Sequence, residues 1–268
     1  MKVDRPILKY FGSKWRMATR IIELLGPHIS YIEPFGGSAA VLLQKEESPI
    51  EVFNDLNHDV VTFFRILRNQ PLALLEQIEA TPYSREEYMA SMEVHDSVTD
   101  LERARCFFIR SWQGFSGSAT MKRNGWRFQQ RIYSTRETKV HLDWHNLERL
   151  ETASVRLRRV QIECGDALKL MKRFDGPDAV FYIDPPYLST VRSKYWNKCA
   201  YTHELTGQDH IHLLNLVKRL KGRVILSCYE SSLYSEHLGG VWEKVQFETV
   251  NNRTTKATEI LWIKPHAR

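Results

Sequence analysis

The chain has few cysteines and no long hydrophobic run, and each absence excludes a class of protein. Its four cysteines, Cys106, Cys164, Cys199 and Cys228, form no CxxC pair and have no histidine at a zinc-like spacing. This pattern argues against a disulfide framework and a zinc cluster, so free cytosolic thiols are expected. No apolar stretch approaches the roughly 18 residues of a membrane helix, and the N-terminus lacks a signal-peptide core, so we expect no membrane association.

Common catalytic signatures are absent as well. The sequence has no GxGxxG loop, no P-loop lysine followed by serine or threonine, and no nucleophile elbow around a serine. Dinucleotide binding, P-loop chemistry and serine hydrolysis therefore have no support. Asp184 with Glu33 or Asp166 lacks the spacing of a metal motif, so no metal is expected.

What the chain does contain is an alternation of short apolar runs and helical stretches. This pattern is typical of an α/β protein with a doubly wound, mostly parallel sheet. A helix over 207–220 is marked by Thr206 and Asp209, an aspartate variant of the capping box, and by Gly222 after its end. The predicted strands are 30–33, 50–53, 160–163, 179–183, 223–227, 242–250 and 259–263, and further helices are predicted at 39–44 and 59–68.

A polar, helix-rich segment over 71–159 interrupts this alternation. It lacks strand–helix–strand spacing, so we predict an insertion between two parts of one sheet domain, 1–70 and 160–268. Within it, residues 101–139 hold nine basic residues against two glutamates, a net charge of +7, together with seven aromatics. Basic side chains neutralise phosphates and aromatic rings stack on bases, which favours nucleic-acid binding. A solvated basic face over an aromatic core is the alternative, and Phe107 and Phe108 are expected in the core in either case.

The string Asp184-Pro185-Pro186-Tyr187 follows the apolar run 179–183, which reads as a buried parallel strand. Open α/β sheets bind ligands beyond the carboxyl ends of their strands. The prolines remove two backbone donors and stiffen the turn, Asp184 adds an acceptor, and Tyr187 offers a flat ring. Together these groups suit a planar heterocycle that carries an amino group.

Other candidate groups stand at neighbouring strand ends. The loop Glu33-Pro34-Phe35-Gly36-Gly37-Ser38 follows the first predicted strand, and its glycines allow close approach of backbone to a ligand. Asp55 follows the second strand, where an acidic residue can accept from both ribose hydroxyls. Asp166 repeats this placement and is able to meet an adenine edge. A turn or a helix cap remains the alternative for both aspartates.

These strings, in this order, resemble the Dam-like adenine-specific DNA methyltransferases, which use S-adenosylmethionine. The resemblance covers residues 5–68 and 156–265. Its motifs are Tyr10-Phe11-Gly12-Ser13-Lys14, the loop from Glu33 to Ala39, Asn54-Asp55-Leu56-Asn57, Cys164-Gly165-Asp166-Ala167, Asp184-Pro185-Pro186-Tyr187, Ser227-Cys228-Tyr229 and Thr258-Glu259-Ile260-Leu261-Trp262. It implies a Rossmann-like methyltransferase fold with a seven-stranded sheet and an inserted target-recognition domain.

The resemblance also implies residue roles. Tyr10 and Lys14 would hold the amino-acid end of S-adenosylmethionine, and Asp55 would bind its ribose. The loop of Glu33, Pro34, Phe35, Gly36, Gly37 and Ser38 would shape the methionine pocket, Asp166 would lie near the adenine, and Asp184 would border the cofactor. Asp184 and the Pro185 carbonyl would accept from the target amino group, with Pro186 stiffening the turn and Tyr187 stacking on the extruded base. The product would be S-adenosyl-L-homocysteine.

The partner implied is double-stranded DNA, bound by a monomer in the cytoplasm of a bacterial, archaeal or phage-infected cell. Within the insertion, Arg110, Gln113, Arg123, Asn124 and Arg127 have side chains able to read bases or contact phosphates. The segment 188–203 is predicted to be a mobile flap that contributes Arg192 and Lys194, with a plain surface loop as the alternative. The chain has Phe-Gly-Gly-Ser where many members have Phe-Val-Gly-Ala-Gly, a change in pocket packing more than in chemistry.

Three other classes of protein stay open at this point, and adenine is favoured over cytosine as the target base. An RNA adenine methyltransferase could use the same cofactor site. A protein or small-molecule amide methyltransferase would more usually carry Asn-Pro-Pro-Tyr, and a cytosine amino-methylating enzyme Ser-Pro-Pro-Trp. A non-catalytic DNA-binding protein on this scaffold would be expected to lose Lys14, Asp55 and Asp184, all of which are present.

Overall fold

The computed structural model describes residues 2–95, 97–115, 125–128, 143–191, 202–250 and 256–265. The chain forms two compact units, each assembled from separate segments. The helical unit comprises Met1–Ala18, Gly37–Glu46 and Asn57–Ile162, and the sheet unit comprises Thr19–Gly36, Glu47–Leu56 and Glu163–Arg268. The predicted insertion, 71–159, falls within the last segment of the helical unit and stays a prediction.

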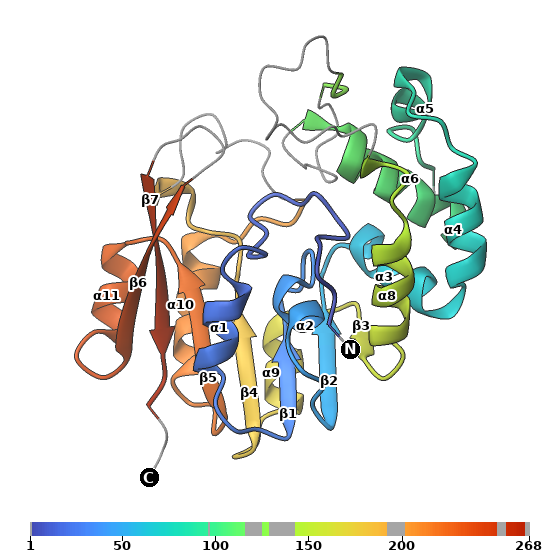
Figure 1. Ribbon diagram of the computed structural model, residues 1–268. Helices are drawn as coiled ribbons and strands as arrows, with labels where there is room; N and C mark the ends of the chain where they lie inside the picture. Colours follow the sequence, from blue (N-terminus) through green and yellow to red (C-terminus); the bar gives the residue numbers. More distant parts are fainter. Residues whose placement is uncertain are drawn as a thin grey trace. The chain divides into compact units, whose positions relative to one another are not determined.

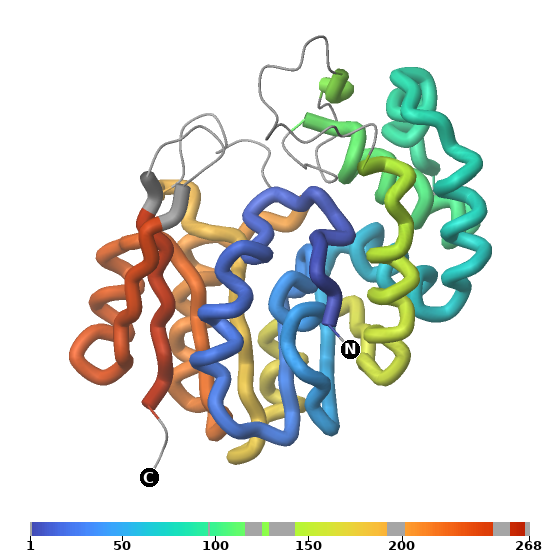
Figure 2. Tube along the Cα trace, viewed as in Figure 1, coloured from blue at the N-terminus to red at the C-terminus, as the bar shows by residue number. Residues whose placement is uncertain are grey.

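A seven-stranded sheet has the order β3-β2-β1-β4-β5-β7-β6 (Figure 1). Strand β1 pairs in parallel with β2 and β4, and β4 with β5, whereas β7 runs antiparallel to both β5 and β6. The chain trace in Figure 2 shows β6 and β7 side by side near the C-terminal end of the chain. This mixed, mostly parallel sheet confirms the predicted fold class. The strands are β1 (Ser30–Glu33), β2 (Ile50–Asn54), β3 (Gln161–Glu163), β4 (Ala179–Ile183), β5 (Arg223–Cys228), β6 (Glu243–Val250) and β7 (Lys256–Ile263).

Strand residues alternate between the two faces of the sheet. Phe181, Leu226 and Ile260 join one buried core with residues of α9 (Ala167–Arg173), α10 (Gly207–Val217) and α11 (Ser232–Leu238). Their neighbours Tyr182 and Ser227 therefore point to the other face, the side on which α1 (Ala18–Leu24) is drawn in Figure 1. The strands β4 and β5 are thus buried on both faces, as their continuous apolar runs predict.

The predicted cap of α10 is confirmed. The Thr206 side chain accepts from the Asp209 backbone, and the Asp209 side chain accepts from the Thr206 backbone. The helix ends at Val217, three residues earlier than expected. Gly222 has a different reason to be glycine: a Cβ there would lie 2.7 Å from the Ala179 carbonyl oxygen, so the close approach to β4 excludes a side chain.

The helical unit is built around aromatic rings. Phe63 on α3 stacks with Phe108 on α6, at 6.1 Å between ring centroids, and Phe108 also contacts Trp144. Phe107 is likewise buried, so the expectation for both phenylalanines is confirmed. The helices of this unit are α2 (Ala40–Gln44), α3 (His58–Asn69), α4 (Pro71–Glu79), α5 (Arg85–Ala90), α6 (Asp100–Gln113) and α8 (Glu148–Arg156).

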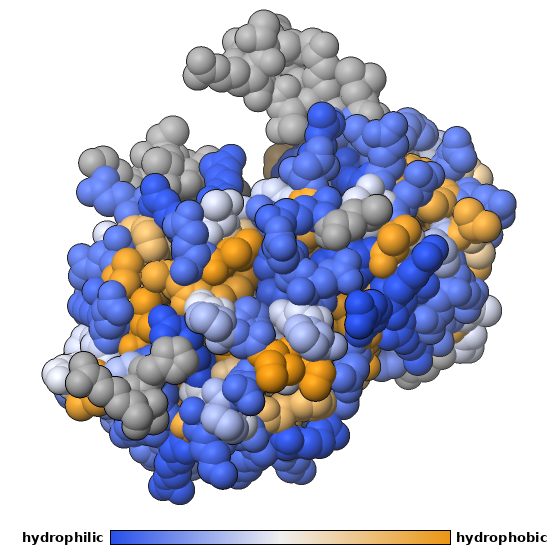
Figure 3. All heavy atoms as spheres, turned by 60° about the horizontal axis from the view of Figure 1, so that its bottom comes forward, coloured by the Kyte–Doolittle hydropathy of each residue, from blue (hydrophilic) through white to orange (hydrophobic). Residues whose placement is uncertain are grey.

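The surface is of the ordinary mixed kind. On the face shown in Figure 3, hydrophilic side chains predominate and hydrophobic ones gather in small groups. No helix in the described ranges is both long and apolar enough to cross a bilayer.

Candidate active site

The carboxyl ends of β1 and β4 form the topological switch point of the sheet. From β1 the strand order runs through β2 and β3 on one side and through β4 and β5 on the other. Open α/β sheets bind ligands in the crevice at such a point. Glu33 is the last residue of β1, and Asp184 directly follows β4. The sheet therefore brings these two predicted site residues to its ligand-binding end.

Four acidic residues among the predicted site residues of the sheet unit stand at or just beyond strand ends. Glu33 is buried and accepts from the Tyr31 hydroxyl at 3.0 Å. Asp55 and Asp184 are half-buried after β2 and β4. Asp166 is exposed, and its Oδ1 accepts from the Lys169 backbone at 2.8 Å as the N-cap of α9, so the cap interpretation holds for that oxygen. Carboxylates accept hydrogen bonds, so this set suits a ligand rich in hydroxyl and amino groups.

The two glycines of the loop after β1 exclude a larger side chain for different structural reasons. A Cβ on Gly36 would lie 2.1 Å from the Phe53 ring, so the close approach predicted there is to the protein's own core. In the helical unit, Gly37 has φ +48° and a Cβ there would lie 3.0 Å from the Tyr10 ring. Ala39 also has a positive φ of 53°, a backbone conformation that is energetically unfavourable for residues other than glycine. The loop is held in an uncommon conformation immediately before α2.

Other predicted cofactor residues of the helical unit hold one another in place. The Ser38 and Ser13 hydroxyls are 2.8 Å apart, and the buried Lys14 ammonium donates to the Gly12 carbonyl at 3.0 Å. Tyr10 lies against Gly37. These contacts join the Tyr10–Lys14 string to the Gly37-Ser38 part of the loop.

Asn54 is a residue of the sheet unit that the sequence interpretation did not single out. Its amide donates to the Pro34 carbonyl at 2.8 Å and to the Gly165 carbonyl at 3.0 Å. Its Oδ1 accepts from the Gly165 backbone N–H at 3.0 Å. A single buried side chain thus fixes the loop after β1 to the turn before Asp166. Gly165 lies 111 residues away in sequence, so only its place in the Asn54-Asp55-Leu56-Asn57 string could have marked Asn54.

Replacing Asn54 with alanine should destabilise the sheet unit and weaken cofactor binding together. Two carbonyls and one N–H would lose their buried partner, at about 1–3 kcal/mol in unfolding free energy. Thermal melting and calorimetry with S-adenosylmethionine measure the two effects. Asn69→Ala, an exposed asparagine of α3, is the matched control. Unchanged cofactor affinity in folded Asn54→Ala protein would contradict a contribution of Asn54 to cofactor binding.

Tyr187 lies at the far end of the Asp-Pro-Pro-Tyr turn with its ring buried. Its hydroxyl contacts Ser227 and donates to Glu259, and its ring meets Tyr229 edge-on. Burial and the charges of Asp184 and Glu259 raise the pKa of Tyr187 well above its ordinary value, so the phenol stays neutral. The ring is a planar apolar surface, and its hydroxyl proton is already donated to Glu259.

Two predicted DNA contacts in the helical unit lie inside it. Arg110 is 5% exposed, and its guanidinium donates to Asp59 at 2.7 Å and to the Ser91 carbonyl. Gln113 is fully buried: its side-chain oxygen accepts from the Trp126 indole N–H at 3.1 Å, and its amide donates to the Pro82 carbonyl at 3.4 Å. Both side chains form internal polar contacts, so their placement favours a structural role over contact with DNA.

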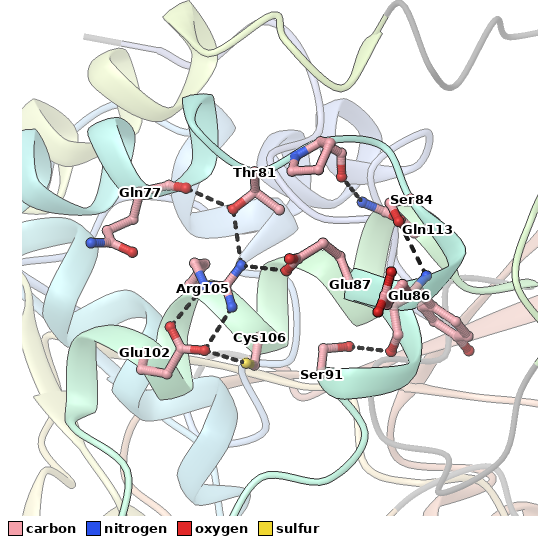
Figure 4. Close-up of polar contacts among 12 residues, drawn as sticks. Gln77, Thr81, Ser84, Glu86, Glu87, Ser91, Glu102, Arg105, Cys106 and Gln113 are labelled. Carbon is pink, nitrogen blue, oxygen red and sulfur yellow. Dashed lines mark hydrogen bonds and ion pairs between the residues drawn. The ribbon is translucent and has the colours of Figure 1, made fainter.

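Other charges of the basic window are also paired internally. Arg105 donates to Glu102 and Glu87, and the Cys106 thiol donates to the same Glu102 (Figure 4). Arg103 pairs with Asp59 at 3.1 Å. Arg127 is partly buried, and burial lowers the pKa of its guanidinium. Arg123, Asn124, Arg192 and Lys194 lie outside the described residues, as does most of the predicted flap.

The mixed seven-stranded sheet, with acidic residues at its β1–β4 switch point, is consistent with the Rossmann-like fold of the S-adenosylmethionine-dependent methyltransferases. The model of the D12 class N6 adenine-specific DNA methyltransferases matches residues 10–255, and the chain belongs to that family. It is an adenine-specific DNA methyltransferase, so its substrate is DNA, and membership of this family implies S-adenosylmethionine as the methyl donor.

Several curated DNA methyltransferases are similar to this protein along most of the chain. The Type II methyltransferase M.MjaIII of Methanocaldococcus jannaschii is 24% identical over 272 residues, covering 92% of this chain and 90% of the relative. A DNA adenine methylase of Vibrio cholerae is 23% identical over 263 residues, covering 95% and 91%. The Type II methyltransferase M1.LlaDCHI of Lactococcus lactis is 25% identical over 249 residues, covering 87% and 84%.

Proposed function

We propose that the enzyme methylates the exocyclic amino group of adenine at specific sites in double-stranded DNA, after rotating the base out of the helix. One observation carries the proposal: Asp184 and the Pro185 carbonyl follow β4 at the ligand-binding end of the sheet. Family membership supplies the reaction, and this turn supplies the acceptors for the amino group.

The acidic residues of the sheet unit fit S-adenosylmethionine, which supplies an electrophilic methyl group when bound. Asp55 is suited to accept from the two ribose hydroxyls and Asp166 from the adenine amino group. Glu33 and its loop are suited to the positively charged methionine part. In the helical unit, Tyr10 and Lys14 remain predicted contacts of the amino-acid end, and S-adenosyl-L-homocysteine is the predicted product.

The acceptors at the turn address the weak nucleophilicity of the amino nitrogen, whose lone pair is delocalised into the purine ring. Hydrogen bonds from its two N–H groups to Asp184 and the Pro185 carbonyl favour a more tetrahedral nitrogen with a localised lone pair. Fixing the nitrogen in this orientation also supplies part of the rate, since alignment makes the step effectively unimolecular.

Base rotation costs a few kcal/mol in lost stacking and pairing. The Tyr187 ring would offset part of this by stacking on the purine, which is worth about 1–3 kcal/mol. Tyr187→Ala should therefore weaken base extrusion as well as methyl transfer.

Methyl transfer from labelled S-adenosylmethionine to DNA, to RNA and to protein extract tests the proposal directly. Label in adenine of DNA alone is expected, and label in RNA or protein would support the alternatives. Expression in a host without other methyltransferases, followed by modification-sensitive sequencing, then gives the recognition sequence.

Arg127 is the predicted DNA contact that the structure describes and does not bury completely. If it touches phosphate, Arg127→Ala should weaken binding about equally on all sequences and reduce the salt slope by about 1. If it reads a base, site preference should change instead. Fluorescence anisotropy over a salt series separates the two, with the exposed Arg159→Ala as control. Unchanged affinity and preference would exclude Arg127 as a contact.

A further inference from the structure

Three polar side chains of the sheet unit meet at the Asp-Pro-Pro-Tyr turn: Tyr187 from the turn itself, Ser227 from β5 and Glu259 from β7. The Tyr187 hydroxyl donates to Glu259 Oε1 and lies 2.9 Å from Ser227 Oγ. Ser227 Oγ donates to the same Glu259 oxygen at 3.0 Å. The three residues are 8%, 0% and 5% exposed for Tyr187, Ser227 and Glu259. They form a closed triangle of hydrogen-bonding groups.

The register of the sheet explains why these groups meet. Ser227 on β5 lies opposite Leu261 on β7, and residues directly opposite share a face. Glu259 is two residues before Leu261, so its side chain points to that same face. The apolar core with α9, α10 and α11 lies on the other face. Glu259 is therefore a carboxylate that β7 directs under the turn after β4.

Burying a carboxylate is costly unless hydrogen bonds compensate it. The hydroxyls of Tyr187 and Ser227 both donate to Glu259 Oε1, which supplies this compensation. The buried Tyr182 is affected by the same negative charges. Its pKa is raised well above the ordinary value, mainly by burial and also by the charges of Asp184, Glu33 and Glu259. Glu259 is thus buried in contact with the tyrosine of the turn that begins with Asp184.

The hydroxyl contact fixes the Tyr187 ring at the end far from its backbone. The near end is fixed by the two prolines, whose φ angles are restricted. On the side, Tyr229 meets the ring at 4.6 Å between centroids and an angle of 68°. A ring held at both ends loses little freedom when a base stacks on it, so more of the stacking free energy remains available.

We propose that Glu259, together with Ser227, is a positioning residue that holds the Tyr187 ring in the orientation needed to receive the extruded base. This inference rests on the proposed function, because it requires Tyr187 to stack on the target adenine. It adds a residue from the last strand, 72 positions from Tyr187, to the groups that control base extrusion.

The variants needed are Glu259→Ala, Glu259→Gln, Tyr187→Phe, Tyr187→Ala and the double variant Tyr187→Phe with Glu259→Ala. Glu243→Gln, an exposed glutamate on β6, is the matched control. The readouts are the single-turnover methylation rate and the fluorescence of 2-aminopurine placed at the target position of the recognition sequence. Calorimetry with S-adenosylmethionine and thermal melting report cofactor binding and folding.

Glu259→Ala should lower the single-turnover rate roughly 10- to 100-fold, because small misplacements of reacting groups have effects of this size. The 2-aminopurine signal should fall with it, while cofactor affinity stays within about twofold. Glu259→Gln keeps an acceptor oxygen and should retain more of both signals. In the Tyr187→Phe background, Glu259→Ala should add little, because the hydroxyl through which it acts is already gone.

Each other outcome has a definite meaning. If Glu259→Ala keeps the wild-type rate and fluorescence while Tyr187→Ala loses both, the positioning role is wrong and stacking by Tyr187 stands. If Tyr187→Ala keeps both, the proposed function of Tyr187 fails. Losses that multiply in the double variant would show that Glu259 acts by another route. If Glu259→Ala does not fold, Tyr187→Phe still tests the proposal. An unchanged methylation rate in Tyr187→Phe would show that the hydroxyl contact does not position the ring.

Discussion

Asp184→Ala is expected to reduce methyl transfer by at least 10²- to 10³-fold, the effect of removing one preorganised hydrogen-bonding group at a reacting centre. Asp184 follows β4 at the switch point of the sheet and is half-buried. Its loss would leave one N–H of the target amino group without its acceptor, so the nitrogen lone pair would stay delocalised. Single-turnover methylation of DNA at saturating S-adenosylmethionine measures the effect.

An aspartate at the other end of β4 provides a matched control. Asp178 is exposed and directly precedes β4, at the end opposite Asp184. Asp178→Ala should methylate at the wild-type rate. Asp184→Asn, which keeps one acceptor oxygen without the charge, should retain more activity than Asp184→Ala. An Asp184→Ala enzyme with the wild-type rate would refute the proposed mechanism.

Sequence patterns predicted the positions of strand ends well, because hydrophobic runs and turn residues are local signals. All seven strands were located, although β7 begins at Lys256, three residues before the predicted start, and the acidic residues after β2 and β4 follow from them. What the patterns could not supply is which groups touch across the sheet. Asn54 binds Gly165, and Tyr187 binds Glu259, through register and long-range packing that no local spacing encodes.

The charge that the insertion presents likewise depends on long-range ion pairs that the local sequence does not reveal. Counting basic residues treats each as solvent-exposed, but Arg103 and Arg110 both pair with Asp59, a residue 44 and 51 positions away. Asp59 lies in the first turn of α3, outside the window where the charge was counted. The positive charge available for DNA in the described part of this segment is therefore smaller than its composition suggests.

Arg110→Ala is expected to lower the free energy of unfolding by about 3–5 kcal/mol, the usual cost of removing one partner from a buried ion pair. Arg110 is nearly inaccessible, and burial lowers the pKa of its guanidinium while Asp59 opposes that shift. Its removal would leave the Ser91 carbonyl and one Asp59 oxygen without their donor. Denaturant unfolding followed by circular dichroism measures the loss.

Arg65 gives the control, because its pair with Asp100 is exposed, with side chains 42% and 50% accessible. Arg65→Ala should cost less than about 1 kcal/mol, as surface pairs do. Removing Asp59 together with Arg110 should lower the stability further, because Asp59 still pairs with Arg103 in the single variant and Arg103 would then lose its partner. Folded Arg110→Ala protein should bind DNA with an unchanged salt slope. A slope reduced by about 1 with full stability would instead make Arg110 a phosphate contact, because each phosphate contact contributes about one released counterion.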